Sequence, residues 1–278
     1  MQESNDGWNH AVEYFKDYQK VNPEWQSKGV VDAFNLERDN ERISCIENDL
    51  NIELTNCNIL EVGSGVGSFL IVAKTKGICC YGIEPNIVGV KTSVIRDDTL
   101  KNKVVIGIGE KLPYKDENFD MVVSFQVLEH TQKPEQVLKE SIRVLKNGGY
   151  LYFVIPNYNS FWEGHYGLYW LPRFPKTLAK IYLKLLGRDP KFLDSIQYIT
   201  PKFISSVLAD ENVEILSIGI ETWKKRLTSL EFSTYGSTKK LLNIVHLIHK
   251  IRLVSLIKYI SIKFDMYYPI ILIARKTR

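Results

Sequence analysis

A short apolar run that leads directly into a glycine-rich turn constrains this 278-residue chain more than any other feature. Residues 59–69 read ILEVGSGVGSF. The apolar start predicts a buried strand. The glycines at positions 63, 65 and 67 predict a turn in which a ligand can approach the backbone closely. A strand, a glycine turn and a helix in this order are typical of α/β folds that bind nucleotides.

Apolar strands alternate with amphipathic helical segments through the middle of the chain. We expect strands near residues 58–62, 79–84, 103–107, 119–125, 149–155, 213–221 and 267–277. We expect helices near residues 66–76, 87–97 and 134–146, and another after Pro201. Strand–helix–strand units of this length form right-handed crossovers in a parallel sheet. The sequence therefore predicts an α/β fold with a doubly wound, mostly parallel, Rossmann-like sheet of seven strands.

The helix expected at 134–146 has the clearest boundaries. Pro134 suits its first turn, and the NGG tripeptide at 147–149 is expected to end it. Beyond residue 156 the pattern becomes irregular and aromatic, which predicts an insertion after the fifth strand.

Composition narrows the class of protein. The chain is 45% hydrophobic and 24% charged, which is typical of a globular protein, and its net charge of +4 is too small to indicate nucleic-acid binding. The four cysteines show no CxxC spacing, so we expect neither a zinc site nor a disulfide framework. We see no signal peptide and no transmembrane run, and expect a cytoplasmic protein with reduced thiols.

The spacing around the glycine turn indicates which ligand it holds. A dinucleotide fingerprint reads G-x-G-x-x-G, whereas the third glycine here comes one residue early. Glu61 lies two residues before Gly63, where a carboxylate would repel a pyrophosphate but attract a cation such as the ammonium or sulfonium of S-adenosylmethionine. Glu84, 21 positions after Gly63, is placed to bind both ribose hydroxyls of either ligand.

Several ordered motifs carry a resemblance to a known family. The segments LEVGSGVGSFL and GIEPN, followed by GEKLPYKDENFDMVVSFQVLEHTQKPEQVLKESIRVLKNGGYLYFVIPN, resemble the class I S-adenosylmethionine-dependent methyltransferases. The small-molecule branch that includes the ubiquinone and menaquinone biosynthesis enzymes is most similar. The resemblance covers roughly residues 57–157, with a weaker likeness at 201–277. It implies the Rossmann-like methyltransferase fold and S-adenosyl-L-methionine as the cofactor.

The resemblance also implies a set of cofactor-binding residues. Glu61 and the loop from Gly63 to Gly67 would face the methionine part, and Glu84 would bind the ribose. Gly109 and Glu110 would lie along the adenine, and Phe125 and Gln126 would line the methyl-transfer channel. The full predicted set is Glu61, Gly63, Ser64, Gly65, Gly67, Glu84, Pro85, Gly109, Glu110, Phe125 and Gln126.

One position departs from the family pattern. Many relatives have an aspartate just after the glycine that matches Gly107, and this aspartate accepts a hydrogen bond from the adenine amino group. This chain has Ile108. Either Glu110 or a backbone carbonyl takes that role, or adenine binds more weakly than usual.

Transfer of a methyl group to an alcohol or phenol needs a base near the acceptor hydroxyl. His165 is the first candidate, because the aromatic segment 157–172 follows the fifth strand and ligands bind beyond the carboxyl ends of strands. The alternative is that His165 only makes a hydrogen bond within an ordered loop.

His130 is the second catalytic candidate. Glu129 with His130 would hold a divalent metal in some relatives, but the RNA 2′-O-methyltransferases with such a site carry a further glutamate where this chain has Gln126. We therefore expect no metal, and the alternative role for His130 is a structural contact behind the cofactor.

A basic, apolar insert at 223–266 separates the last two expected strands. Its segment 241–264 is expected to be helical, with a narrow cationic stripe that includes Lys250 and Lys258. Three partners can cover so apolar a surface: the aromatic segment 157–172, a second copy of the chain in a homodimer, or a membrane interface. The last would make the cytoplasmic protein peripheral at the membrane surface.

These observations predict four parts and one principal activity. The parts are a helical N-terminal cap (1–56), an S-adenosylmethionine-binding core (57–157), a substrate-side insertion (158–200) and the C-terminal part of the core with its insert (201–278). The first hypothesis is O-methylation of a bulky small molecule, a glycan or a lipid-linked intermediate. The alternatives are methylation of nitrogen, carbon or RNA, and a non-catalytic partner protein that binds S-adenosylmethionine. No nucleic-acid partner is expected.

Overall fold

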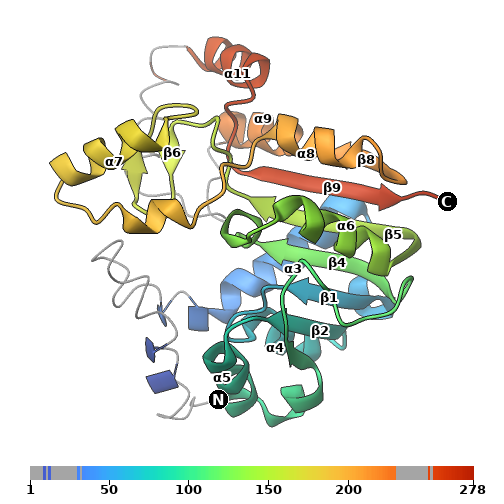
Figure 1. The fold of residues 1–278 in the computed structure, drawn as a ribbon. Coiled ribbons are helices and arrows are strands. Elements are labelled where there is room, and N and C mark those ends of the chain that lie inside the picture. The colour runs from blue at the N-terminus through green and yellow to red at the C-terminus, as the bar shows by residue number, and fades with distance from the viewer. Residues whose placement is uncertain (1–8, 11, 14–29, 32, 230–249, 251–252) are drawn as a thin grey trace.

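The structure is a computed structural model that describes residues 9–10, 12–13, 30–31, 33–229, 250 and 253–278 (Figure 1). Its α-helices are α3 (Leu36–Leu50), α4 (Ser68–Thr75), α5 (Ile87–Arg96), α6 (Pro134–Val144), α7 (Lys176–Leu185), α8 (Pro201–Leu208), α9 (Ile220–Ser229) and α11 (Val254–Lys263). Its strands are β1 (Asn58–Val62), β2 (Cys79–Glu84), β3 (Val104–Ile106), β4 (Phe119–Phe125), β5 (Leu145–Ile155), β6 (Trp162–Glu163), β7 (Leu168–Tyr169), β8 (Val213–Ser217) and β9 (Ile270–Lys276). Short 3₁₀ turns are η1 (Leu54–Asn56), η2 (Asp98–Asn102), η3 (Leu128–His130) and η4 (Lys191–Asp194).

Seven strands form one sheet in the order β3-β2-β1-β4-β5-β9-β8 (Figure 1). Neighbours from β3 to β5 pair in parallel, whereas β9 runs antiparallel to both β5 and β8. The predicted fold class, a mostly parallel seven-stranded Rossmann-like sheet, is confirmed. The chain order reverses between β1 and β4, so the carboxyl ends of these two strands mark the edge at which ligands bind in such folds.

Helices cover both faces of the sheet, and each face has its own apolar core. On one face α3 and α4 pack against the sheet through side chains such as Ile43, Ile46 and Phe69. On the other face α6 and α8 pack through Leu138 and Ile204. The helix expected after Pro201 is α8, whose cap is the Thr200 hydroxyl accepting from the Phe203 amide at 3.2 Å. Burial on both faces explains why the central strands read as continuous apolar runs.

The tripeptide NGG lies inside β5, so the prediction that it ends the preceding helix was wrong. Helix α6 ends at Val144, and Leu145 already pairs with Phe119 in the sheet. The pairing then shifts, so that Tyr150 lies opposite Met121. The two glycines fit this bulge, because Gly148 has φ +80° and a Cβ on Gly149 would lie 2.9 Å from a backbone carbonyl of β4.

The strand expected near 213–221 is shorter than predicted. β8 ends at Ser217, and α9 begins at Ile220. Gly219 makes the change of direction, because it has φ +92° and a Cβ there would lie 2.8 Å from the Ile271 amide nitrogen of β9. Only a glycine fits a position with both constraints.

The insert expected at 223–266 begins within α9, and its described remainder contains α11. Residues 230–249 and 251–252, including most of the predicted helix 241–264, lie outside the described residues. Leu253 is not helical and precedes α11, so 241–264 is not one uninterrupted helix. In the predicted N-terminal cap (1–56), residues 1–8, 11, 14–29 and 32 are also outside the described residues.

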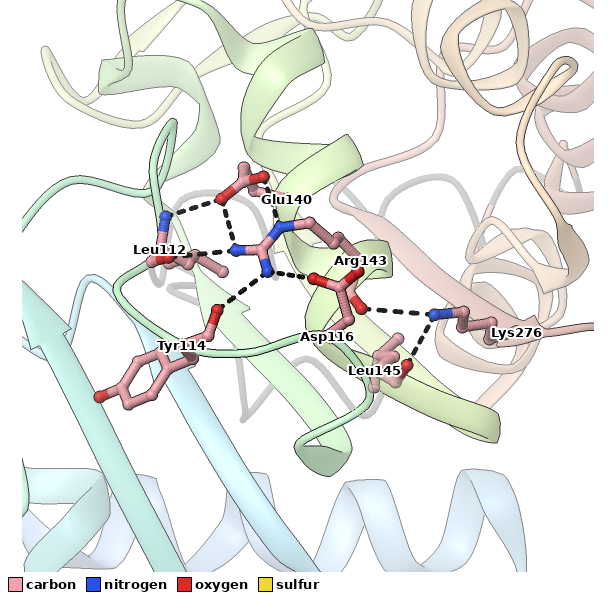
Figure 2. Close-up of polar contacts among 7 residues, drawn as sticks. All are labelled: Leu112, Tyr114, Asp116, Glu140, Arg143, Leu145 and Lys276. Atoms are coloured by element: carbon pink, nitrogen blue, oxygen red, sulfur yellow. Dashed lines mark hydrogen bonds and ion pairs between the residues drawn. The ribbon is translucent and has the colours of Figure 1, made fainter.

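Arg143 of α6 fixes the loop that follows β3 (Figure 2). Its guanidinium donates to the backbone carbonyls of Leu112 and Tyr114 at 3.1 and 2.9 Å, and to the carboxylate of Asp116 at 2.6 Å. Glu140 accepts from Arg143 at 2.8 Å and from the Leu112 amide at 2.8 Å. These bonds hold residues 112–116 against α6 and so position the preceding Gly109 and Glu110 at the ligand edge.

Candidate active site

The glycine turn between β1 and α4 adopts a backbone that side chains rarely permit. Gly63, Gly65 and Gly67 have φ values of +78°, +54° and +79°. A Cβ on Gly63 would lie 2.4 Å from Val127, and one on Gly67 would lie 2.6 Å from Ser93. The turn therefore needs glycine for its conformation and for its close packing. The amide of Gly63 donates to the Ile83 carbonyl at 2.9 Å, which ties the turn to β2.

Glu84 links the end of β2 to the glycine turn. One of its carboxylate oxygens accepts from the Gly65 amide at 2.9 Å, and the other accepts from the Asn86 amide at 3.0 Å. Pro85 follows, and Asn86 then caps α5 by accepting from the Val88 amide at 2.9 Å. Glu84 as a whole is only 4% exposed. These contacts orient Glu84 beside the turn, and its role at the ribose stays a prediction.

Glu61 places a carboxylate with one unpartnered oxygen beneath the turn. The residue is 4% exposed, and its Oε2 has no hydrogen-bond partner among the described residues. The same is true of the Ser64 hydroxyl. Burial raises the pKa of Glu61 well above its ordinary value, and nearby Asp39 raises it further while Arg42 opposes this. A bound cation would supply the missing partner.

Helix α3 contributes two charged residues that the sequence analysis missed. Asp39 is fully buried and accepts from Arg42 Nη1 at 2.6 Å, and the Arg42 guanidinium lies 4.3 Å from the centre of the Phe125 ring. Both residues act on the pKa of Glu61. In the sequence, the only sign of their role is that they are charged residues within an amphipathic helix. Such residues usually face solvent, so the sequence alone does not indicate that they lie near Glu61.

The predicted adenine-side residues lie on the loop after β3. Gly109 is buried, and a Cβ there would lie 3.0 Å from Val62 of β1. The Glu110 carboxylate accepts from the Gln132 and Lys133 amides at 2.9 and 3.3 Å, just before α6 begins. One oxygen of Glu110 is thus already used, whereas Ile108 is half exposed. Their adenine contacts stay predictions.

The two residues predicted to line the methyl-transfer channel differ in their surroundings. The Phe125 ring is 8% exposed and packs against Phe69, with 5.3 Å between ring centres. Gln126 is exposed at the carboxyl end of β4 and has φ +57°, a strained value for a residue with a side chain. Of the two, the Gln126 side chain is the one that reaches solvent at this edge.

The structure joins the two predicted catalytic histidines in one cluster, which we call the histidine cluster: Glu129, His130, Glu163 and His165. The Nε2 atoms of His130 and His165 lie 3.0 Å apart, and His165 Nδ1 lies 2.7 Å from Glu163 Oε1. Glu129 Oε1 lies 3.7 Å from His130 Nε2 and 3.8 Å from His165 Nε2. His130 comes from η3 after β4, and His165 from the insertion after β5.

Two of the four groups in the cluster are shifted toward the neutral form. Burial raises the pKa of Glu129 to about 7, although His165 opposes it. Burial and the neighbouring His165 lower the pKa of His130 to about 3. Burial would also lower the pKa of His165, but Glu163 and Glu129 outweigh it and raise the pKa above its ordinary value. Burial likewise opposes the ionised form of Glu163, yet His165 lowers its pKa overall.

The histidine cluster lies close to the glycine turn. A Cβ on Gly63 would clash with the Val127 side chain, so these two residues are in close contact. Val127 lies two residues before Glu129. The segment therefore packs against the turn at the carboxyl ends of the neighbouring strands β1 and β4. This places acid–base groups beside the predicted cofactor loop, which is the arrangement that group transfer from a bound cofactor requires.

The aromatic insertion forms a small core of its own and also exposes apolar side chains. Tyr166 and Trp170 are buried with Leu183 of α7, away from solvent. Tyr158 is buried, stacks on Tyr198 and donates to Glu163 at 3.2 Å. By contrast, the exposed aromatics of the insertion are Phe161 and Tyr169.

A cleft of about 350 Å³ opens between the insertion and the segment after α11. Its lining residues are Asn159, Pro172, Arg173, Lys263, Phe264, Asp265 and Met266. Arg173 Nε donates to Asn159 Oδ1 at 2.8 Å, which fixes the guanidinium at the cleft wall.

Among the described residues, no helix combines the length and the apolar character needed to cross a bilayer.

Comparison with known proteins now identifies the central part of the chain. Residues 60–153 match the sequence pattern of a family described as "Methyltransferase domain". The chain carries a class I S-adenosylmethionine-dependent methyltransferase domain. The matched residues include the end of β1, the glycine turn, Glu84 and η3, so the resemblance predicted from the sequence is confirmed.

Curated methyltransferases resemble this methyltransferase domain over part of their length. Norajmaline N-methyltransferase of Rauvolfia serpentina is 38% identical over 96 residues, which are 33% of this chain and 33% of that protein. The ubiquinone/menaquinone biosynthesis C-methyltransferase UbiE of Laribacter hongkongensis is 33% identical over 147 residues, 51% of this chain and 57% of that protein. The chain thus matches between a third and somewhat more than half of the length of these relatives.

A solved structure shares the fold of the methyltransferase domain. Geranyl diphosphate C-methyltransferase from Streptomyces coelicolor A3(2), solved with Mg²⁺, geranyl diphosphate and S-adenosyl-L-homocysteine, superposes with a TM-score of 0.51. The superposition covers 86% of this chain and 79% of that one, at 13% sequence identity. At this identity the likeness supports the fold alone.

Methyltransferase domains of this class use S-adenosylmethionine, and the residues of the glycine turn fit that cofactor. The unpartnered oxygen of Glu61 suits the positive charge of the methionine part, and the Ser64 hydroxyl is free to bond beside it. The glycine turn leaves its backbone accessible, and Glu84 already lies against it. When bound, the cofactor supplies an activated methyl group on a sulfonium that is a good leaving group.

Proposed function

We propose that the chain transfers the methyl group of S-adenosylmethionine to an oxygen of a bulky small molecule, a glycan or a lipid-linked intermediate. The observation that carries this proposal is the position of the histidine cluster. It contains a histidine held by a buried carboxylate, and it adjoins the glycine turn at the switch point of the sheet. Positioning of acceptor and methyl donor supplies much of the rate, and the cluster supplies the acid–base group that a hydroxyl requires.

His165 is the residue placed to activate the acceptor. Glu163 Oε1 lies 2.7 Å from His165 Nδ1, so His165 Nε2 faces His130. Glu163 is itself fixed, because it accepts from the Tyr166 amide at 2.6 Å and from Tyr158 at 3.2 Å. A histidine oriented in this way is typical of a general base or of a group that polarises a hydroxyl.

A nitrogen acceptor is the second candidate, and the similarity to norajmaline N-methyltransferase favours it. A neutral amine already carries a free lone pair, so its methylation does not need a protein base that removes a proton first. The presence of four interacting titratable groups at the ligand edge therefore supports oxygen over nitrogen. Carbon methylation, the reaction named for UbiE, remains an alternative for a phenolic acceptor.

The division of the chain into four parts is also proposed. Residues 57–157 hold the cofactor, the cap at 1–56 adds Asp39 and Arg42 near Glu61, and the insertion at 158–200 brings His165 to the acceptor side. The C-terminal part (201–278) completes the sheet with β8 and β9. The cleft with Arg173 and Lys263 offers room for part of a bulky acceptor.

We further propose a cytoplasmic protein that contacts the membrane surface through the 223–266 insert. In α11 the exposed apolar side chains include Leu256 and Tyr259, and Phe264 follows them. The cationic residues Lys258 and Lys263 lie on the same helix. Exposed apolar and basic side chains together support binding to anionic lipid. A homodimer through the same surface is the alternative.

An acceptor panel tests the proposed reaction. Purified protein is incubated with S-adenosylmethionine and with matched hydroxyl, amine and phenolic compounds, and the release of S-adenosylhomocysteine is measured with the mass of each product. We expect methylated oxygen in the hydroxyl or phenolic set. Methylation of amines alone would replace the oxygen hypothesis, and cofactor binding without turnover on any acceptor would favour a non-catalytic partner protein.

A further inference from the structure

Three ligand atoms in the histidine cluster converge on one point. The Nε2 atoms of His130 and His165 are 3.0 Å apart, and Glu129 Oε1 lies 3.7 and 3.8 Å from them. The centre of this triangle is about 2 Å from each atom, which matches the roughly 2.0–2.2 Å at which zinc binds imidazole nitrogen and carboxylate oxygen. The three side chains are also mutually close enough to hold one metal ion.

Glu129 is the member of the cluster whose environment is otherwise unexplained. Its side chain is fully buried, and neither carboxylate oxygen has a hydrogen-bond partner among the described residues. A hydrogen bond between the two imidazoles would account for their own separation, but it would leave both oxygens of Glu129 unpaired. A buried carboxylate without hydrogen bonds is costly, so it indicates a partner that occupies the centre of the triangle.

We propose that Glu129, His130 and His165 bind a divalent first-row metal ion, with zinc as the preferred ion. Two imidazoles and one carboxylate form a ligand set that zinc uses in catalytic sites, whereas magnesium prefers a shell of oxygens. Sequence reasoning favoured no metal, because it considered Glu129 and His130 with Gln126. The third ligand is His165, which the fold brings from 35 positions away.

The surroundings orient these ligands for a metal. Glu163 holds His165 Nδ1 at 2.7 Å, so His165 Nε2 is the atom left for the ion. A carboxylate behind a metal-binding histidine is a common supporting contact. The backbone carbonyl of Glu129 accepts from the Gln197 amide at 2.7 Å, and the His130 amide donates to the Val127 carbonyl at 2.8 Å. The turn that carries both ligands is thereby fixed on each side.

Three protein ligands leave at least one position on the ion open. This step rests on the proposed function, but with His165 Nε2 on the ion His165 would act on the acceptor through the metal and not as a free base. The acceptor hydroxyl would take the open position. The metal would lower the pKa of the hydroxyl, whose proton would pass to solvent. The oxygen would then form a bond to the methyl carbon as the carbon–sulfur bond breaks, and the electron pair would stay on sulfur. The products would be the methyl ether, S-adenosylhomocysteine and one proton.

Calorimetric titration of the full chain tests the metal site. The protein is dialysed against a chelator, then titrated with zinc, manganese or magnesium chloride. We expect one equivalent of zinc to bind, with weaker binding of magnesium. Glu129→Gln and His130→Asn should abolish this event, and Glu163→Gln should weaken it about 10–100-fold, as is usual for a residue that orients a metal ligand. His10→Asn removes a histidine outside the cluster and should change nothing.

Two further measurements separate loss of the metal site from loss of the fold. Binding of S-adenosylhomocysteine by each variant shows whether the fold survives, and the visible absorption of the Co²⁺-loaded wild type reports the ligand set without mutation. Equal zinc affinity in the wild type, Glu129→Gln and His130→Asn would overturn the proposal, as would the absence of any zinc binding. Full methyl transfer by the metal-free protein would exclude the catalytic step through the metal while leaving the proposed function intact.

Discussion

The side chains of His130 and His165 meet with 3.0 Å between their Nε2 atoms, although all of α6 and β5 lie between them in the chain. Two candidate residues that were predicted separately thus belong to one cluster. Glu163 lies on the far side of His165, and Glu129 lies beside both rings. The four side chains therefore interact as one unit, and neither histidine is isolated from the other.

Replacement of His165 tests the cluster as the site of acceptor activation. We expect His165→Ala to reduce turnover roughly 100-fold or more, the usual effect of losing an acid–base group, with cofactor affinity unchanged. Steady-state kinetics on the best acceptor and calorimetry with S-adenosylhomocysteine measure the two quantities. His10→Ala serves as the control. Normal turnover of His165→Ala would move the search to Tyr158, Tyr166 or His130.

Replacement of a glycine in the turn tests the cofactor loop. Gly65→Val should abolish cofactor binding in a folded protein, because the branched side chain would occupy the space through which the ligand approaches the backbone. Gly77→Val is a matched control, since Gly77 has φ +74° but lies in open space. Both variants carry similar backbone strain, and only the first should lose binding. If Gly65→Val binds the cofactor normally, the turn is not the site.

The contact between Arg143 and Glu140 predicts how stability depends on pH. The hydrogen bond from Arg143 lowers the pKa of Glu140 in the folded state. Its contribution is therefore complete above the unfolded pKa of about 4.3, and it is lost as the pH falls through the lower folded value. At pH 7 we expect Glu140→Gln to reduce the free energy of unfolding by about 1–2 kcal/mol, because the bonded groups remain partly in water.

Urea unfolding from pH 7 to pH 3 measures this dependence. The difference between the wild type and Glu140→Gln should shrink as the pH falls below the unfolded pKa of about 4.3 and through the lower pKa of the folded Glu140 carboxyl. Glu214→Gln, at an exposed position on β8, should leave the free energy of unfolding close to the wild-type value. A Glu140→Gln difference that stays constant across this range would show that the ion pair does not stabilise the fold.

Vesicle co-sedimentation tests the membrane contact of the 223–266 insert. We expect the protein to pellet with anionic vesicles at low salt and to be released at high salt, because screening weakens attraction to the lipid surface. Lys250→Glu/Lys258→Glu should reduce pelleting. A monomer that remains in the supernatant at every salt concentration would instead indicate that the insert folds back as an internal lid.

The sequence predicted the features that depend on local pattern. Strand and helix periodicity located the parallel part of the sheet, and the glycine turn follows β1 as expected, with positive φ values at its three glycines. Local pattern was less reliable where long-range packing decides the structure. The NGG tripeptide looked like a helix end, yet pairing of Leu145 with Phe119 draws it into β5.

The missed parts of the site share one physical cause. Asp39 and Arg42 reach Glu61 only because α3 packs against the same face as α4. His165 reaches Glu129 only because the insertion after β5 folds back toward η3. No periodicity in a single sequence reports contacts between segments that are far apart in the chain. Placement of these side chains therefore required the tertiary structure.

Calorimetric titration with S-adenosylmethionine, S-adenosylhomocysteine and NAD tests the central claim most directly. The glycine turn, the unpartnered carboxylate of Glu61 and the orientation of Glu84 predict one site for the first two ligands. Dissociation constants should lie on the order of 1 μM to 1 mM, the range of small-molecule enzymes. NAD should give no binding heat. Tight binding of NAD, or no binding of either S-adenosyl compound, would contradict the assignment of residues 60–153 as an S-adenosylmethionine-dependent methyltransferase domain.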